Sequence, residues 1–435
     1  MRAALVGLLA ATALLGSWSS AQADGTRNCG WALVISGSQL NIAFPDQAAT
    51  YWSMNQPIPP GGYIEIHGQF PHARYTSLTS YTGQTQAIDG LNDTHIQPDP
   101  GSTNPFLPGA DRDAARRDYT VHVVSAQVPA DSRPPNTIYT TNADGSKSSN
   151  GLGRIVLRIY EGDDGMGTEG GVPLPDVTLV TSSGQRTTLP QCPDTGVPDL
   201  GQVATLANAG TGEELPNTGL GGTDPPVWHK YTNLVSGAIL AATDQQATGG
   251  APTAVTNQTD SALPPGGFYE NPDNKYVTST FSRGLGQVLA FRAKAPTFPQ
   301  TRDGEKRMGW MDAGSWMTGQ VRYWSFCTNA QTTAYYGCVQ DDQVPVDADG
   351  DYTIVVSTAS ARPRNATDQC GVAWVPAGPG PQSLLIMRNM LPDPSFAEAI
   401  QNAKPGTEQQ TMGVYYPRGK YYASTADFEA LGCPA

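Results

Sequence analysis

Three carboxylates and one imidazole lie close together in the segment 89–99 (Asp-Gly-Leu-Asn-Asp-Thr-His-Ile-Gln-Pro-Asp). They belong to Asp89, Asp93, His95 and Asp99, which we take as candidate catalytic residues. Two aspartates can share the roles of general acid and general base, as in glycoside hydrolysis. A solvated loop whose side chains bond their own backbone explains the same residues. We predict no cofactor and no metal ligands, with a divalent cation at this loop as the open alternative.

Aromatic and methionine side chains gather in a second segment, 302–320, which includes Trp310 and Trp316. Aromatic faces bind sugar rings and apolar polymers, and methionine adapts to irregular shapes. The segment therefore indicates a surface on which a glycan or polymer stacks. The alternative is a loop that packs its own aromatic residues over the protein.

Arg74 and Arg322 occupy equivalent places in a repeated sequence and are candidate ligand-binding residues. An arginine in each copy could clamp a carboxylate or sulfate. In the structural alternative, each arginine pairs with a nearby acid and fixes the end of a strand. A duplicated feature most simply serves a duplicated fold, which favours this alternative.

The elements that must position these residues come in two copies. Matched segments run in the same order: 70–71 and 298–299, 73–78 and 321–326, 118–121 and 351–354, 155–158 and 385–388, and Pro45-Asp46 with Tyr51 and Pro272-Asp273 with Tyr276. Five collinear matches predict two copies of one folding unit. The copies differ in length within 83–117 of the first and just before residue 321 of the second. Loops that differ between copies are where function most often diverges.

The composition predicts an all-β protein, because 48 glycines and 36 prolines separate short alternating apolar runs. Runs such as 63–67, 119–123 and 154–160 have the residue pattern of strands. We expect two tandem antiparallel jelly-roll-like β-sandwich domains with little helix. Short helices are predicted only near the C-terminus, at 395–403 behind a capping box and at 425–431.

The repeated pattern resembles a known bacterial family. The pattern is Arg-Tyr-x-Ser after an apolar strand, then a Pro-Asp-Pro-Gly or Asp-x-Asp-Gly turn, then a long strand ending in arginine. It is similar to the family known as domain of unknown function 1214. The resemblance covers residues 43–180 loosely and 267–390 more closely. It implies a jelly-roll-like sandwich in each copy. It implies no catalytic residue, because the family's activity is unknown.

The N-terminus predicts export. Arg2 precedes an apolar run over 3–15, and the small-x-small pattern at 21–23 predicts cleavage of a signal peptide, residues 1–23. We then expect a first sandwich over 24–192, a Gly/Pro-rich linker over 193–226 and a second sandwich with short C-terminal helices over 227–435. The predicted location is secreted, either extracellular or periplasmic.

Six cysteines in an exported chain predict disulfides. Their positions favour three pairs: Cys29 with Cys192 around the first copy, Cys327 with Cys338 around a short loop, and Cys370 with Cys433 at the C-terminal tail. A thiolate metal site is the alternative, but the chain has no C-x-x-C spacing.

Charge and missing motifs limit the function classes. A net charge of −13 argues against nucleic acid as a partner, and no later apolar run is long enough for a membrane span. The chain lacks a G-x-S-x-G elbow, an H-E-x-x-H motif and a P-loop. We expect a secreted, non-enzymatic protein that binds a glycan, a cell-envelope polymer or a protein. The alternative is an extracellular carboxylate-dependent hydrolase, acting on glycans through the segment 89–99.

Overall fold

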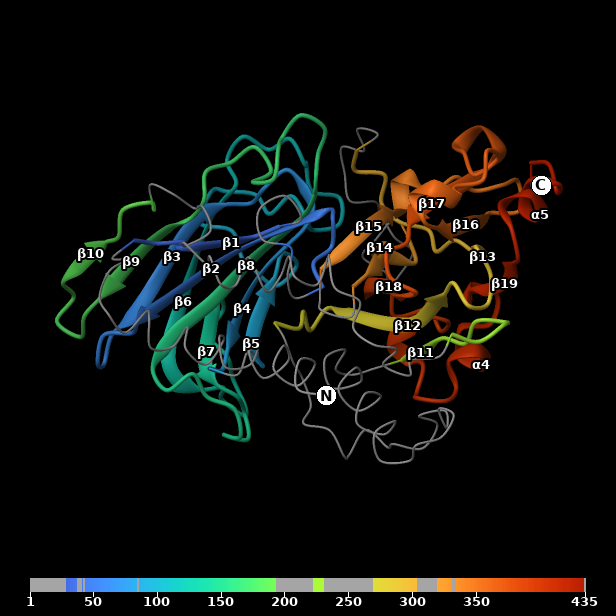
Figure 1. Cartoon of the computed structure of the whole chain (residues 1–435). Coiled ribbons are helices and arrows are strands. Elements are labelled where there is room, and N and C mark those ends of the chain that lie inside the picture. Colours follow the sequence, from blue (N-terminus) through green and yellow to red (C-terminus); the bar gives the residue numbers. More distant parts are fainter. Residues whose placement is uncertain are drawn as a thin grey trace, which may run out of the picture.

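The structure is a computed structural model that describes residues 29–36, 41, 44–83, 86–192, 222–230, 269–302, 319–330 and 334–433. The predicted signal peptide, most of the predicted linker, Trp310 and Trp316 lie outside these residues. Figure 1 shows two sheet-rich halves side by side, the first in blue to green and the second in yellow to red. No helix within the described ranges is long and apolar enough to cross a membrane.

The first half consists of two five-stranded sheets. One has the order β1 (Leu33–Ile35), β2 (Ala49–Pro57), β8 (Leu152–Gly162), β4 (Ala73–Tyr81), β5 (Ala87–Asn92). The other has the order β10 (Arg186–Thr188), β9 (Asp176–Val180), β3 (Tyr63–Gln69), β6 (Asp118–Gln127), β7 (Thr137–Thr141). Burial alternates along β3, as expected for a strand with one face in the core. Ile64 and Ile66 of β3 pack with Leu78 and Ile155 of the facing sheet.

The second half repeats this plan with one sheet of five strands and one of four. The first has the order β11 (His229–Lys230), β12 (Asn274–Ser282), β18 (Gln382–Pro392), β14 (Val321–Asn329), β15 (Tyr335–Gln340). The second has the order β17 (Val372–Pro376), β16 (Asp351–Ser357), β13 (Val288–Lys294), β19 (Arg418–Tyr422). The repeated segments fall on corresponding strands, β4 with β14 and β8 with β18, so the order β2-β8-β4-β5 recurs as β12-β18-β14-β15.

The predicted all-β class is confirmed, with one difference in detail. Most neighbouring strands are antiparallel, but β6 pairs with β7 in parallel, and so does β16 with β17. In both halves a longer connection, 128–136 or 358–371, carries the chain back before the next strand begins. The two halves therefore share this departure from a purely antiparallel sandwich.

The C-terminal region contains two short α-helices, α4 (Glu408–Met412) and α5 (Thr425–Glu429). The helix predicted at 425–431 is confirmed as α5, which begins with a capping box between Ser424 and Asp427. The helix predicted at 395–403 is wrong, because only a 3-10 turn, η5 (Ile400–Asn402), forms there. The Ser395 hydroxyl donates to the Asp393 carboxylate, 2.6 Å away, instead of capping a helix.

All three predicted disulfides are present. Cys29–Cys192 joins the start of the first half to its end, Cys327–Cys338 links directly opposed residues of β14 and β15, and Cys370–Cys433 holds the C-terminal segment. Three disulfides are consistent with an oxidising compartment outside the cytoplasm.

Candidate functional site

The repeated Arg-Tyr-x-Ser motif lies where the two halves meet. Arg74 of β4 donates from Nη1 to the Asp341 carboxylate, 2.8 Å away. Arg322 of β14 donates from Nη1 to the Asp93 carboxylate, 3.1 Å away. Each arginine belongs to one half and its acid to the other, and all four side chains are 0 % exposed. The two ion pairs are therefore reciprocal contacts across the junction.

The tyrosines of the motif cross the junction in the same way. The Tyr75 hydroxyl donates to Asp273 at 2.7 Å, and the Tyr323 hydroxyl donates to Asp46 at 2.8 Å. The rings of Tyr160 and Tyr323 meet edge to face with centroids 5.5 Å apart, so aromatic packing joins the polar contacts. Both aspartates belong to the Pro-Asp pairs that recur in the two copies.

The arginines that end the repeated segments 155–158 and 385–388 make a third reciprocal set. Arg158 of β8 donates to the Tyr269 carbonyl at 2.8 Å, and Arg388 of β18 donates to the Phe44 carbonyl at 2.9 Å. Each carbonyl belongs to the opposite half. The repeated residues thus form the surfaces that hold the halves together.

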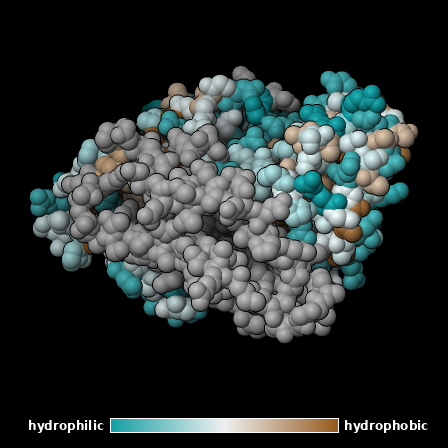
Figure 2. Space-filling model, viewed as in Figure 1, coloured by the Kyte–Doolittle hydropathy of each residue, from teal (hydrophilic) through white to brown (hydrophobic). Residues whose placement is uncertain are grey.

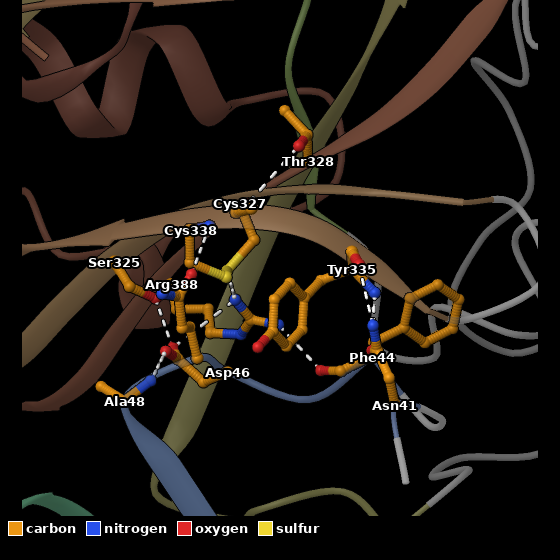
Figure 3. Close-up of a disulfide and its surroundings, with 12 residues drawn as sticks. Asn41, Phe44, Asp46, Ala48, Ser325, Cys327, Thr328, Tyr335, Cys338 and Arg388 are labelled. Atoms are coloured by element: carbon orange, nitrogen blue, oxygen red, sulfur yellow. Dashed lines mark hydrogen bonds and ion pairs between the residues drawn. A yellow bond between two sulfur atoms is a disulfide. The ribbon is translucent and has the colours of Figure 1, made fainter. Parts of the chain in front are cut away.

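Figure 3 shows one side of this junction around the Cys327–Cys338 disulfide. Asp46 accepts from the Ser325 hydroxyl at 2.6 Å and lies 3.6 Å from Arg388, whose Nη1 also reaches the Cys327 sulfur at 2.8 Å. The segment that carries Asp46 comes from the first half and runs along the strands of the second (Figure 3).

The burial of Arg74 and Arg322 corrects their assignment as ligand-binding residues. Both guanidinium groups face the other half and are closed to solvent. A ligand that binds from solvent therefore has no access to either side chain. The structure has the alternative arrangement, in which each arginine pairs with an acid. Each acid comes from the other half of the protein and not from a nearby position in the same half.

Asp89 and Asp93, two of the four candidate catalytic residues, have separate structural partners. Both terminal nitrogens of Arg133 donate to Asp89 at 2.8 Å. Asp93 is 0 % exposed, pairs with Arg322 and accepts from the Thr76 amide at 2.8 Å. Burial raises the pKa of Asp93 to about 6, although the nearby Arg322 charge lowers it. Asp93 is thus a structural residue that joins the two halves.

His95 and Asp99 have other partners again. His95 Nδ1 lies 2.8 Å from the Asn92 amide oxygen, and Asp99 accepts from the Thr120 hydroxyl at 3.0 Å. The imidazole that approaches Asp99 is that of His67, at 3.6 Å, and not that of His95. The four candidate residues are thus each in contact with a different partner.

A different group of carboxylates gathers at the junction. Oxygens of Glu161, Asp341 and Asp342 all lie within 4.8 Å of one another, and we call these three residues the junction carboxylates. Glu161 lies near the end of β8 in the first half. Asp341 and Asp342 follow β15 in the second half, in the 3-10 turn η2 (Asp341–Gln343). Their side chains are 2 %, 0 % and 16 % exposed, so the group reaches solvent through Asp342.

Arg302 lies against the junction carboxylates. Its Nη1 is 2.9 Å from Glu161 and 3.4 Å from Asp342, while its Nη2 is 2.7 Å from Asp164. Burial, and then the negative charge of Asp342, raises the pKa of Glu161 to about 7. Burial likewise raises the pKa of Asp341 to about 6. The carboxylates are therefore crowded and incompletely neutralised, a condition typical of functional sites as well as of ion-pair networks.

The two segments in which the copies differ come together beside this group. Arg302 is the first residue of the Trp/Met segment of the second half. Arg112 belongs to the long segment 83–117 of the first half, and it donates to the Thr301 carbonyl at 3.3 Å. Arg112 also pairs with Asp163 at 2.8 Å. The two copy-specific segments thus meet beside the junction carboxylates.

Sequence reasoning missed this group because its members lie far apart in the chain. The available signal was a pair of acidic doublets, Asp163-Asp164 and Asp341-Asp342, each just after a strand of the repeat. Neither doublet has a diagnostic spacing. Only the junction between the halves brings them close to one another.

Comparisons with known proteins add little to this picture. No family model matches the sequence, so the resemblance to domain of unknown function 1214 stays a prediction, and no curated protein matches either. An uncharacterised protein from Burkholderia cenocepacia aligns over 97% of this chain and 88% of its own, with a TM-score of 0.48 and 12% identity. The VPA0106 protein from Vibrio parahaemolyticus aligns over 96% of both chains, with a TM-score of 0.41 and 11% identity. Neither likeness carries a functional argument.

Proposed function

We propose that the protein is an exported, non-enzymatic binding protein whose ligand is a glycan, a cell-envelope polymer or another protein. We place the ligand where the halves meet, beside the junction carboxylates. One observation carries this proposal: the two copy-specific segments come together beside this group, since Arg112 of one donates to the carbonyl of Thr301, the residue just before the other. A duplicated scaffold leaves specific recognition to the parts that differ between its copies.

The side chains at this place suit a polar ligand. Arg302 is 34 % exposed and Asp164 is 68 % exposed, so both offer hydrogen bonds to hydroxyl or amide groups. Described residues on the face shown in Figure 2 are largely hydrophilic, and the hydrophobic ones are scattered. Trp310 and Trp316, which belong to the same chain segment as Arg302, are the predicted stacking residues.

The hydrolase alternative has less support. Asp89, Asp93, His95 and Asp99 each contact a different partner, whereas an acid and base pair would both face one substrate. The hydrolase alternative stays a prediction. An assay for reducing ends released from glycans incubated with the protein tests it directly.

A binding screen with matched variants tests the proposal. The mature protein is incubated with a glycan array and with cell-envelope polymers, and hits are measured by thermal shift. Replacing both Trp310 and Trp316 by alanine should abolish the shift, and Arg302→Ala should weaken it. Arg364→Ala is the control, because Arg364 is exposed and pairs with Glu429 near the C-terminus. Equal binding by all variants would place the ligand elsewhere.

A further inference from the structure

Two buried oxygens beside the junction carboxylates have no hydrogen-bond partner within the described residues: Glu161 Oε2 and Gln340 Oε1. The Gln340 side-chain amide nitrogen lies 3.5 Å from Glu161 Oε1, so the amide group is directed at the carboxylates. Gln340 is 6 % exposed and Glu161 is 3 % exposed. Buried polar atoms nearly always have partners, so two unpartnered oxygens at one place call for an explanation.

The charges at this place are also unbalanced. Asp341 is neutralised by Arg74, and Arg302 is shared among Glu161, Asp342 and Asp164. Four carboxylates therefore face two guanidinium groups. Because Glu161 and Asp341 are buried, water screens their mutual repulsion poorly. An additional cation would supply the missing positive charge.

We propose that a divalent cation of the hard class, Ca²⁺ in preference to Mg²⁺, binds between Glu161, Asp341 and Asp342. The Gln340 amide oxygen would be a further ligand once the side-chain amide turns over, because its nitrogen is the atom that now faces Glu161. All these donors are oxygens, the atoms that Ca²⁺ uses in proteins. Ca²⁺–oxygen distances of about 2.4 Å place opposite ligands roughly 4.8 Å apart. One carboxylate oxygen from each of the three residues fits that span, since these three atoms lie within 4.8 Å of one another.

The irregular origin of the ligands favours Ca²⁺ over Mg²⁺. Glu161 comes from one half and the other three residues from the second half, on a strand end and a 3-10 turn. Ca²⁺ accepts irregular sets of six to eight oxygens, whereas Mg²⁺ requires a nearly ideal octahedron and keeps several waters.

Arg302 competes with such a cation without leaving the site. Its Nη1 contacts Glu161 and Asp342, which the cation would take over. Its Nε and Nη2 bond Asp164 at 2.9 and 2.7 Å, and these contacts can remain. The cation site goes beyond the proposed ligand binding, because its ligands lie outside the Trp/Met segment and it would exist without any polymer.

Calorimetric titration of the full mature protein tests the site after treatment with a chelator. We expect one Ca²⁺ per chain, a rise in melting temperature on addition of Ca²⁺, and weaker binding of Mg²⁺. Glu161→Gln and Asp342→Asn should abolish both signals. Asp347→Asn should keep them, because Asp347 lies in a separate acidic hairpin paired with Arg292.

Arg302→Ala provides a variant in the opposite direction. Loss of the competing guanidinium should tighten Ca²⁺ binding several-fold, a result that damage to the fold could not produce. Absence of Ca²⁺ binding by the native protein, or unchanged binding by Glu161→Gln and Asp342→Asn, would overturn the site. Polymer binding that persists in the chelator-treated protein would leave the proposed function standing even if the cation site fails.

Discussion

Arg322→Met is the perturbation that most directly tests the reciprocal junction. The substitution removes the guanidinium from Asp93 while it keeps most of the side-chain volume. Both partners are 0 % exposed and 3.1 Å apart. Breaking a buried pair by removing one partner costs about 3–5 kcal/mol. Asp93 keeps its bond from the Thr76 amide, so we expect a loss in free energy of unfolding near the lower limit.

Urea unfolding of the mature protein with intact disulfides measures this loss, provided that both halves unfold in one transition. The double variant Arg322→Met with Asp93→Leu should recover most of the stability, because it leaves no buried charge unpaired. Arg364→Met, which breaks an exposed pair with Glu429, should change little. The reasoning is refuted if Arg322→Met costs no more than Arg364→Met, or if the double variant is less stable than the single one.

Three further results are expected at or near the junction. Folding raises the pKa of Asp93 from 3.8 to about 6, so its contribution to stability is full below pH 3.8 and is lost as pH rises through 6. Asp93→Asn should therefore remove part of the fall in unfolding free energy between these pH values. Parallel curves of unfolding free energy against pH for the native protein and the variant would contradict this. Replacing Cys327 and Cys338 by serine opens a loop with a sequence separation of 11 and should cost about 2–3 kcal/mol in thermal or urea unfolding; an unchanged midpoint would contradict it. Tyr75→Phe removes a hydrogen bond to the carboxylate of Asp273 and should cost about 1.5–3 kcal/mol, whereas a neutral effect would show that the hydroxyl contributes nothing.

Much of the fold follows from local patterns. Alternating apolar runs separated by turn residues predicted strands, and the strands of the repeat formed as expected. The disulfides were predictable because position reduced the choices: one pair spans a short loop and another brackets the first copy. The helix predicted at 395–403 does not form. Its expected capping residue, Ser395, donates its hydroxyl instead to the carboxylate of Asp393, two residues earlier in the chain.

The candidate site was less predictable, because its contacts join distant residues. Arg74 and Asp341 are 267 positions apart, and no local pattern selects that partner among the acids of the chain. The density of acids in 89–99 indicated chemistry, yet folding assigns Asp89 to Arg133 and buries Asp93 against the other half. The repeat drew attention to the residues that form the junction, but it did not indicate that residues of one copy contact residues of the other.

The reciprocity of the junction has a consequence for the history of the chain. In an isologous interface, residue i of one subunit contacts residue j of its partner, and j contacts i. Arg74 with Asp341 and Arg322 with Asp93 have this form inside a single polypeptide. Such a junction is what fusion of a two-fold homodimer would leave behind. Equivalence imposed by symmetry ends at fusion, after which each former subunit is free to acquire a segment that its twin lacks.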